Sequence, residues 1–371
     1  MKPRDAKVER EWTDFLEKCA HVDVEKNRLD VIANEGFFAN CWVTLWSLTR
    51  TYPSARYMKV NWTAQDLWRN NDQAGKNLFD LYFHPNSDLD THALANVPHI
   101  YPHGVYRDLE FDKLNPYISN YFAPSEIVRN KINDLVNKYK IDYDNTIGVW
   151  YRGTDKFTEL TPVPPRYYVA EIQRLIRKNP RLRVLLQTDQ EQIRDIFVRE
   201  FGEQVFYLSE LPVTKSLIGI HHISTEERGT SNFEFGTTLL AVINIVAKCR
   251  YVVTYTGCIG LWTYLYRGNA QNTCQLRPRL PDLISQYDDE AIVERITTRA
   301  DVSSAIIEEE NYELRSKNND LQYELDAITT SFMYRRMKSI ATKIDRLFPD
   351  NTSRGEFRKQ ITRTLRTQTN R

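Results

Sequence analysis

Apolar side chains follow two different spacings near the start of the chain. Residues 30–33 predict a short strand, and the polar loop 34–40 comes directly after it. From 41 to 48 the apolar positions recur at the spacing of a helix, which Pro53 ends. Residues 60–62 predict a further strand. The opening segment therefore predicts the order strand, loop, helix, strand.

The pattern is weaker in the segment that follows. Residues 70–114 are rich in Asn, Asp, His and Pro, and they predict long loops with short helices. Apolar positions within 125–139 predict a helix that leads into the second half of the chain.

From residue 146 onward, strands and helices alternate more clearly. The predicted strands are 146–150, 183–187, 205–208 and 250–254, and the predicted helices are 167–177, 189–201, 234–247 and 259–266. This alternation is typical of a parallel sheet wrapped by helices. We therefore predict an α/β fold with an amino-terminal domain at 1–140 and a carboxyl-terminal domain at 141–300.

A helical extension at 301–371 completes the predicted architecture. Apolar residues within 307–332 recur at every seventh position, namely Ile307, Leu314, Leu321 and Ile328. This spacing predicts a coiled coil and a homodimer through 307–332. A helix packed on its own body accounts for the spacing equally well, so both interpretations stay open.

The end of the extension is basic. Residues 331–371 contain 11 Lys and Arg against 3 Asp and Glu, although the whole chain has a net charge of only +1. Apolar positions from Met333 to Phe348 form one stripe among these basic residues, which predicts a peripheral contact with an anionic membrane. Packing against the acidic remainder of the chain is the alternative. That acidic remainder argues against a nucleic-acid partner.

Composition limits the predicted location. No apolar run in the 371 residues approaches the roughly 20 residues that a membrane-spanning helix needs. The charged amino end lacks the apolar core of a signal peptide. The five cysteines show no CxxC spacing, which fits a reducing compartment. We predict a cytoplasmic protein with a peripheral contact at the inner membrane face.

The loop after the strand 146–150 carries groups suited to a diphosphate. Arg152 supplies a planar cation that can hold two phosphate oxygens, and Gly153 allows close backbone approach. Asp155, Lys156 and Glu159 follow within seven residues of Arg152. A surface turn with an internal Arg–Asp salt bridge is the alternative interpretation.

The segment TIGVWYRGTDKFTE resembles the signature of the α1,6-fucosyltransferases and their O-fucosyltransferase relatives. That family ends the strand in His-Val-Arg-Arg-x-Asp-Lys, and the spacing is kept here at Arg152, Asp155 and Lys156. Trp150 and Tyr151 depart from the family pattern. The resemblance implies a GT-B fold, in which two Rossmann-like domains face a cleft. It also implies that Arg152 binds the β-phosphate of GDP-fucose and assists departure of the nucleotide.

Two later segments follow the family's order. Residues 185–189 are similar to the family's strand ending in Thr-Asp, whose acid lies near the nucleotide, and this implies that role for Asp189. Thr256, Gly257 and Cys258 resemble the segment that contacts phosphate, although the family has a Ser pair where Gly257 and Cys258 stand. The family's acid in the preceding helix is replaced by Val242.

The loop at 34–38 adds a carboxylate. It is similar to the amino-terminal loop of the O-fucosyltransferases, in which some members use the Glu of a Glu-Gly-Phe run as general base. An inverting transfer needs such a base to remove the acceptor proton, which implies that role for Glu35. Glu159 is the second candidate. A structural carboxylate at a helix start remains the alternative for Glu35.

The resulting hypothesis is an inverting glycosyltransferase that needs neither metal nor cofactor. The chain lacks an Asp-x-Asp arrangement and an HxxxH spacing. We expect L-fucose to pass from the donor substrate GDP-fucose to the hydroxyl of a glycan or lipid-linked glycan, in surface polysaccharide or glycoconjugate synthesis. The alternatives are the same fold with another nucleoside-diphosphate hexose, or a glycan-binding scaffold without activity.

Overall fold

A five-stranded parallel sheet organises the carboxyl-terminal half of a computed structural model that describes residues 16–51, 57–87, 94–97, 100–154, 163–215 and 219–277. Its strands are β4 (Thr146–Tyr151), β5 (Arg183–Thr188), β6 (Val205–Phe206), β7 (Tyr251–Tyr255) and β8 (Thr273–Leu276). They lie in the order β6-β5-β4-β7-β8. Every residue of β4 is buried, as expected for the central strand of a parallel sheet covered on both faces.

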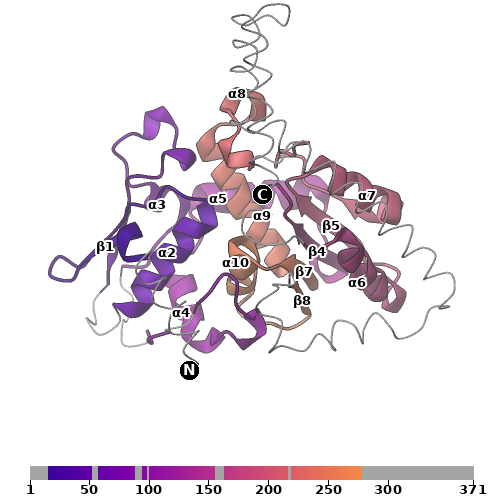
Figure 1. The fold of residues 1–371 in the computed structure, drawn as a ribbon, viewed down its shortest axis with the longest axis horizontal. Coiled ribbons are helices and arrows are strands. Elements are labelled where there is room, and N and C mark those ends of the chain that lie inside the picture. The colour runs from indigo at the N-terminus through magenta and orange to yellow at the C-terminus, as the bar shows by residue number, and fades with distance from the viewer. Residues whose placement is uncertain are drawn as a thin grey trace, which may run out of the picture. The chain divides into compact units, whose positions relative to one another are not determined.

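Helices cover both faces of this sheet (Figure 1). They are α6 (Pro165–Lys178), α7 (Glu191–Phe201), α9 (Asn232–Lys248) and α10 (Cys258–Arg267), and the one-turn helix α8 (Thr225–Arg228) precedes α9. The connections through α6 and α7 lead outward in one direction from β4, and those through α9 and α10 lead back in the other. The predicted α/β class with a Rossmann-like sheet is therefore confirmed.

The amino-terminal half contains a smaller sheet. Here β1 (Ala20–Asp23) pairs antiparallel with β2 (Arg28–Val31), and β2 pairs parallel with β3 (Lys59–Trp62). The helix α2 (Phe37–Arg50) joins β2 to β3 and confirms the predicted order of strand, loop, helix and strand. The remaining helices of this half are α3 (Leu78–Tyr82), α4 (Phe111–Tyr121) and α5 (Glu126–Tyr139).

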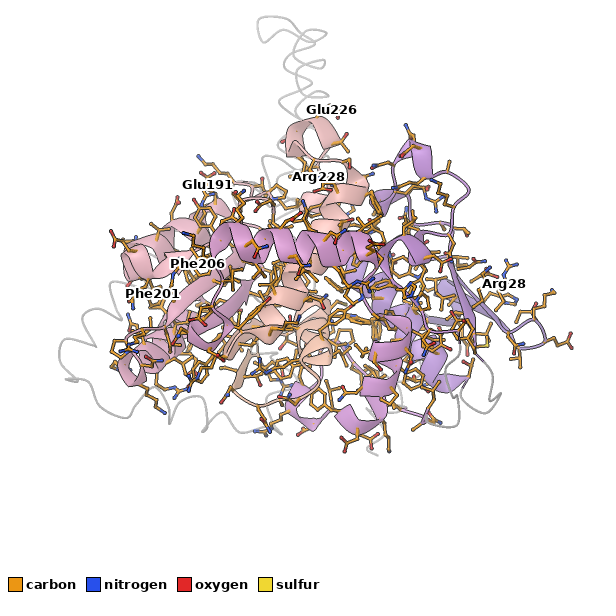
Figure 2. The ribbon with its side chains drawn as sticks, turned by 180° about the vertical axis from the view of Figure 1, so that it is seen from behind. Arg28, Glu191, Phe201, Phe206, Glu226 and Arg228 are labelled. Atoms are coloured by element: carbon orange, nitrogen blue, oxygen red, sulfur yellow. The ribbon has the colours of Figure 1, made fainter. Side chains whose placement is uncertain are left out.

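One apolar core extends through both halves. All positions of α9 from Phe235 to Ala247 are buried, because α5 and α10 pack against this helix from different sides. Phe122 meets Trp262 of α10 edge to face, with ring centroids 4.7 Å apart. Figure 2 shows the extent of the unit, with Arg28 of the small sheet at one end and Phe206 of the large sheet at the other.

Part of the predicted architecture lies outside the described residues. The described ranges belong to a compact unit, Met1–Ala291, and a second unit, Ile292–Arg371, is not described. The predicted coiled coil at 307–332 and the basic segment at 331–371 therefore stay predictions, as do the domain boundaries at 140 and 300. Among the described helices, none combines the length and apolar character that crossing a bilayer requires.

We predict that Gly260→Ala destabilises the protein by about 1–3 kcal/mol, measured by urea unfolding. A Cβ at Gly260 would lie 2.1 Å from the Tyr255 carbonyl oxygen, so α10 would have to move away from β7. The control is Gly36→Ala, because a Cβ at Gly36 meets nothing within 4 Å. Equal stability of the two variants would contradict this account of the packing.

Candidate active site

The carboxyl ends of β4 and β7 meet where the direction of the strand order reverses. From β4 the chain moves outward through β5 and β6, and it then returns to the other side of β4 to form β7 and β8. In open α/β sheets, ligands bind in the crevice at such a point. The loop after β4 contains Arg152 and Gly153, and the loop after β7 contains Thr256 and Gly257. Four residues predicted for donor binding therefore lie on the two loops that flank this point.

Asp189 holds the loop that follows β4. The Gly153 amide donates a hydrogen bond to its Oδ1 at 3.0 Å, and the Thr154 hydroxyl donates to its Oδ2 at 2.6 Å. The Arg152 Nε lies 3.8 Å from the same Oδ2. This meeting follows from the register, because Tyr151 of β4 is opposite Thr188 of β5, and one residue later each strand has ended. Charged hydrogen bonds of this kind are stronger than neutral ones.

The Arg152 side chain is 23% exposed and that of Asp189 is 18% exposed. The Arg152 side chain is therefore partly exposed beside the Asp189 carboxylate. Its orientation is constrained by a carboxylate that is itself fixed by two further donors. The salt bridge expected in the alternative interpretation is thus present with Asp189, and it positions the arginine without burying it.

Gly153 is required by a close contact within the protein. A Cβ at this position would lie 2.0 Å from the Gln190 Oε1 atom. Gln190 is 4% exposed and has little room to move aside. The predicted close approach of the Gly153 backbone to a phosphate stays a prediction. The group that approaches it in the structure is a glutamine side chain.

The loop after β7 is held by a residue of the amino-terminal half. The Gly257 amide donates to the Tyr106 hydroxyl at 2.7 Å. The single proton of that hydroxyl is shared between two carbonyl oxygens within reach, that of Pro102 and that of Gly257 at 2.8 Å. Gly257 has φ 156° and ψ 178°, a conformation that favours glycine. Tyr106 is fully buried, and burial raises its pKa well above the ordinary value, so it stays a neutral phenol.

Thr256 is also engaged within the protein. Its hydroxyl accepts a hydrogen bond from Gln275 Nε2 at 3.1 Å and donates to the Leu276 carbonyl oxygen at 3.3 Å. Cys258 is the first residue of α10 and is partly exposed. The phosphate contacts of Thr256, Gly257 and Cys258 stay predictions. In the structure, Thr256 and Gly257 form hydrogen bonds with other groups of the protein.

Glu35 lies at the start of α2 with its side chain exposed. Its backbone is fixed, because its amide donates to Asn40 Oδ1 at 3.1 Å and its carbonyl oxygen accepts from Trp68 Nε1 at 2.7 Å. Burial, and secondarily the Glu35 carboxylate, raise the pKa of the Cys19 thiol. Within the described part of the chain, these contacts belong to the amino-terminal half, and none joins Glu35 to Arg152.

The first turns of α2 and α10 are nevertheless close to one another. Burial, followed by the thiol of Cys258 in α10, raises the pKa of Cys41 in α2 well above its ordinary value. The two helices are in contact. The loop that carries Glu35 and the loop that carries Gly257 therefore precede neighbouring helices from different halves of the chain.

Three predicted site residues, Asp155, Lys156 and Glu159, lie outside the described residues, and their roles stay predictions. No group of three or more His, Cys, Asp or Glu side chains suited to a metal occurs within the ranges that the structure describes. Sequence reasoning missed Thr154, although it lies within the Arg152 motif. It also missed Tyr106, which no local signal could identify because its partner is 151 positions away.

Comparison with known proteins finds a structural similarity only. No family model and no curated protein matches the chain. A structure of NodZ alpha-1,6-fucosyltransferase soaked with GDP-fucose matches with 16% identity and a TM-score of 0.39, over 65% of this chain and 91% of the other. A NodZ structure co-crystallized with GDP matches with 17% identity and a TM-score of 0.37, over 65% and 90%.

These solved structures are of the kind of enzyme that the motif resemblance named. The ligand and the reaction of this chain are therefore argued below from its own residues.

We predict that Tyr106→Phe lowers the free energy of unfolding by about 1–3 kcal/mol, because the buried Gly257 amide loses its acceptor. Urea unfolding measures the change. Tyr143→Phe is the control, because the half-buried Tyr143 hydroxyl makes no hydrogen bond within the described residues. A Tyr106 variant as stable as this control would show that the hydroxyl does not hold the loop.

Proposed function

We propose that this chain is an inverting glycosyltransferase that moves L-fucose from GDP-fucose to a glycan hydroxyl without a metal ion. The observation that carries the proposal is the position of Arg152, which Asp189 orients at the carboxyl edge of β4 beside the reversal of strand order. A diphosphate suits this place, because a planar cation oriented by a carboxylate can bind two phosphate oxygens, and open α/β sheets bind ligands where the strand order reverses. The motif resemblance supplies the sugar and the nucleotide.

The proposed reaction is a single displacement. The acceptor oxygen attacks the anomeric carbon of the sugar as the bond from that carbon to the β-phosphate oxygen breaks. Arg152 stabilises the negative charge that grows on the departing GDP, and its preorganised position makes this stabilisation effective. The acceptor proton passes to a carboxylate, for which Glu35 is our first candidate and Glu159 the second.

The fixed backbone of Glu35 supports its candidacy. Asn40 is fully buried and binds both the amide and the carbonyl oxygen of Glu35. The exposed carboxylate therefore projects from a rigid turn. A base needs this combination, because it has to meet an incoming hydroxyl at a defined distance.

The acceptor and the site of action are further proposals. A lipid-linked glycan would be met at the inner membrane face, and the apolar stripe among basic residues within 331–371 suits an anionic lipid surface. A homodimer through 307–332 would place two catalytic units beside each other. Surface polysaccharide or glycoconjugate synthesis is the setting that these features favour.

We predict that Arg152→Ala lowers kcat/KM for transfer from GDP-fucose by about two orders of magnitude or more and leaves the fold intact. Arg152→Lys should recover little of this, because an ammonium does not reproduce the planar fork. GDP release measures the rate. Arg177→Ala, in the last turn of α6, is the control. Transfer by Arg152→Ala at the rate of this control would reject the assignment.

We predict that transfer continues in excess EDTA, because cationic side chains carry out the charge stabilisation that a metal provides elsewhere. The GDP-release assay is run with and without the chelator. Loss of activity that Mg²⁺ or Mn²⁺ restores would refute the metal-independent mechanism.

We predict that Glu35→Gln slows the chemical step by roughly two to four orders of magnitude and changes GDP affinity little, as expected of a general base. Single-turnover transfer and GDP binding separate the two effects. Glu159→Gln is the matched comparison. If only Glu159→Gln shows this behaviour, Glu159 is the base and Glu35 is a structural carboxylate.

A further inference from the structure

A buried tryptophan, Trp68, lies where the turn that carries Glu35 meets residues of both halves. Trp68 is 2% exposed, and its indole Nε1 donates a hydrogen bond to the Glu35 carbonyl oxygen at 2.7 Å. Its own carbonyl oxygen accepts from the Tyr82 hydroxyl, also at 2.7 Å. Its ring meets that of Phe37, the first residue of α2, edge to face with centroids 5.3 Å apart. These contacts fix Trp68 to the amino-terminal half.

The same indole ring packs against the carboxyl-terminal half. Phe235, near the start of α9, is stacked on it with centroids 5.6 Å apart and an interplanar angle of 17°. His221 is stacked on it at 6.1 Å and 21°. Aromatic pairs at such separations attract one another beyond the effect of their buried area. One side chain therefore connects the Glu35 backbone with two rings of the other half.

Hydrogen bonds on either side of Trp68 join its segment to the start of α9. Before it in the chain, the Asp66 carbonyl oxygen accepts from Asn232 Nδ2 at 3.2 Å. After it, Asn70 Oδ1 accepts from the Phe233 amide at 3.1 Å. The backbone that carries the indole is therefore attached to the same helix on which the indole ring is stacked.

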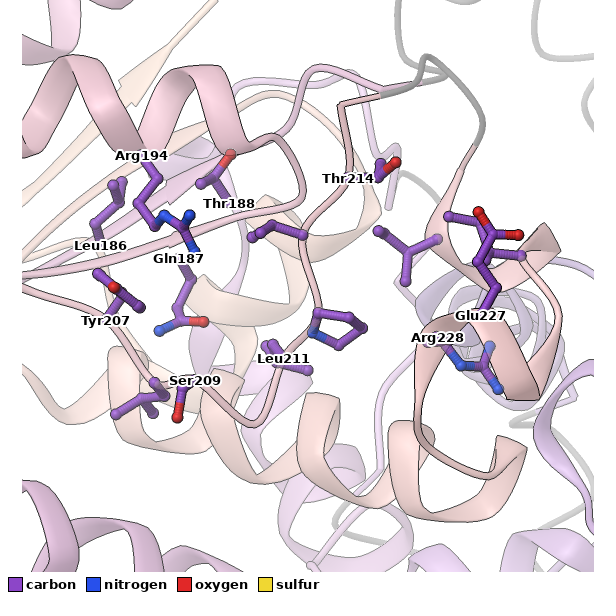
Figure 3. Close-up of a pocket in the computed structure, with 15 residues that line it drawn as sticks. Leu186, Gln187, Thr188, Arg194, Tyr207, Ser209, Leu211, Thr214, Glu227 and Arg228 are labelled. Atoms are coloured by element: carbon purple, nitrogen blue, oxygen red, sulfur yellow. The ribbon is translucent and has the colours of Figure 1, made fainter.

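These contacts continue as far as a cavity in the carboxyl-terminal half. The guanidinium carbon of Arg228 lies 4.7 Å from the centroid of the Phe235 ring. Arg228 is 7% exposed and lines a cavity of about 380 Å³ at the carboxyl ends of β5 and β6 (Figure 3). Its Nε and Nη2 donate to the Thr230 carbonyl oxygen, each at 3.3 Å. Arg228, Phe235 and Trp68 therefore form a series of contacts from the cavity wall to the turn that carries Glu35.

A general base on one half has to be placed relative to a donor that the other half binds. Asn40 fixes the Glu35 backbone within the amino-terminal half, whereas Arg152 and Asp189 belong to the carboxyl-terminal half. Trp68 relates the two, because it contacts both. Accuracy matters here, since misplacing a catalytic group by about 1 Å can cost about two orders of magnitude in rate.

We infer that Trp68 is a positioning residue, which holds the turn that carries Glu35 against α9 and so sets where the base meets the acceptor hydroxyl. This inference rests on the proposed function, in which Glu35 is the first candidate for the base. Trp68 is buried and acts on the reaction through Glu35.

The test compares Trp68→Phe with Trp62→Phe in the full chain. Trp68→Phe keeps an aromatic ring against Phe235 and removes the indole donor to Glu35. Trp62→Phe is the matched control, because Trp62 is fully buried and its Nε1 donates to the Thr44 hydroxyl at 3.0 Å. The control therefore also loses one buried indole hydrogen bond, but that bond does not involve Glu35.

Amide hydrogen exchange, followed by mass spectrometry, measures the attachment of the turn without any ligand. We expect Trp68→Phe to speed exchange of the amides of residues 34–40 about ten-fold, and Trp62→Phe to change it by less than about two-fold. Exchange in β4 should keep its wild-type rate in both variants. Unchanged exchange at 34–40 in Trp68→Phe would overturn the inference.

GDP release from GDP-fucose, with water as the acceptor, measures the consequence for the reaction. The water oxygen attacks the anomeric carbon, the water proton passes to Glu35, and GDP departs. We expect Trp68→Phe to lower kcat about ten-fold and to change GDP affinity, measured by calorimetry, by less than about two-fold. An equal loss of kcat and of GDP affinity would overturn the inference.

A double-mutant comparison separates positioning from a merely structural role. In a Glu35→Gln background, Trp68→Phe should lower kcat no further, because its effect passes through Glu35. A further loss of about ten-fold in that background would show that Trp68 acts independently of Glu35, and would overturn the inference.

Phe235→Leu keeps the test decisive if Trp68→Phe fails to fold. This variant leaves the indole hydrogen bond in place and removes one of the rings on which the indole is stacked. We expect about three-fold faster exchange at 34–40 in Phe235→Leu. The wild-type rate of exchange in this segment would contradict the inference.

The outcomes also separate this inference from the proposed function. Faster exchange at 34–40 in Trp68→Phe, with Glu35→Gln as active as the wild type, would support the attachment of the turn and reject Glu35 as the base. Faster exchange without any GDP release from GDP-fucose would support the attachment and reject the proposed function. Loss of GDP release in Glu35→Gln with unaltered exchange in Trp68→Phe would reject the inference and leave the proposed function standing.

Discussion

The carboxylate of Asp189 fixes the geometry on which the candidate site depends. It accepts hydrogen bonds from the Gly153 amide and the Thr154 hydroxyl and lies beside the Arg152 guanidinium. The register between β4 and β5 brings these groups together. An exposed arginine would otherwise sample many rotamers, and a neighbouring anion limits that freedom.

The two halves of the described unit are joined by buried contacts as well as by the chain. The helix α9 lies between α5 and α10, and the rings of Phe122 and Trp262 meet across the halves. Trp68 stacks on Phe235 at 5.6 Å and also binds the Glu35 carbonyl oxygen. The loop with the candidate base is therefore supported by packed residues that also contact the carboxyl-terminal half.

Local periodicity was sufficient to predict most of the larger sheet and its helices. The positions of β4, β5 and α9 follow from the sequence, because each is a largely apolar run of the length expected for a strand or for a helix. The helix α4 was not predicted, because it contains Pro116 in a polar segment. β8 was also missed, since a four-residue edge strand leaves little periodicity. Of the candidate site, the sequence predicted the Arg152 motif, and its contact with a phosphate stays a prediction.

Long-range partners account for what sequence reasoning missed in the site. The Tyr106 hydroxyl reaches Gly257 over 151 positions, and the Trp68 indole reaches the Glu35 carbonyl oxygen over 33 positions. Such contacts are set by how the elements pack. Neither residue belongs to a spacing pattern or motif from which its role could be predicted.

The bond between Tyr106 and Gly257 has a consequence for how a ligand would meet the loop after β7. A glycine in this conformation is normally the freest point of a loop, because it has the most conformations to lose. Here both polar groups of its peptide backbone are bound before any ligand arrives. The entropy of ordering this loop is therefore lost during folding, and a ligand meets a surface that is already in shape.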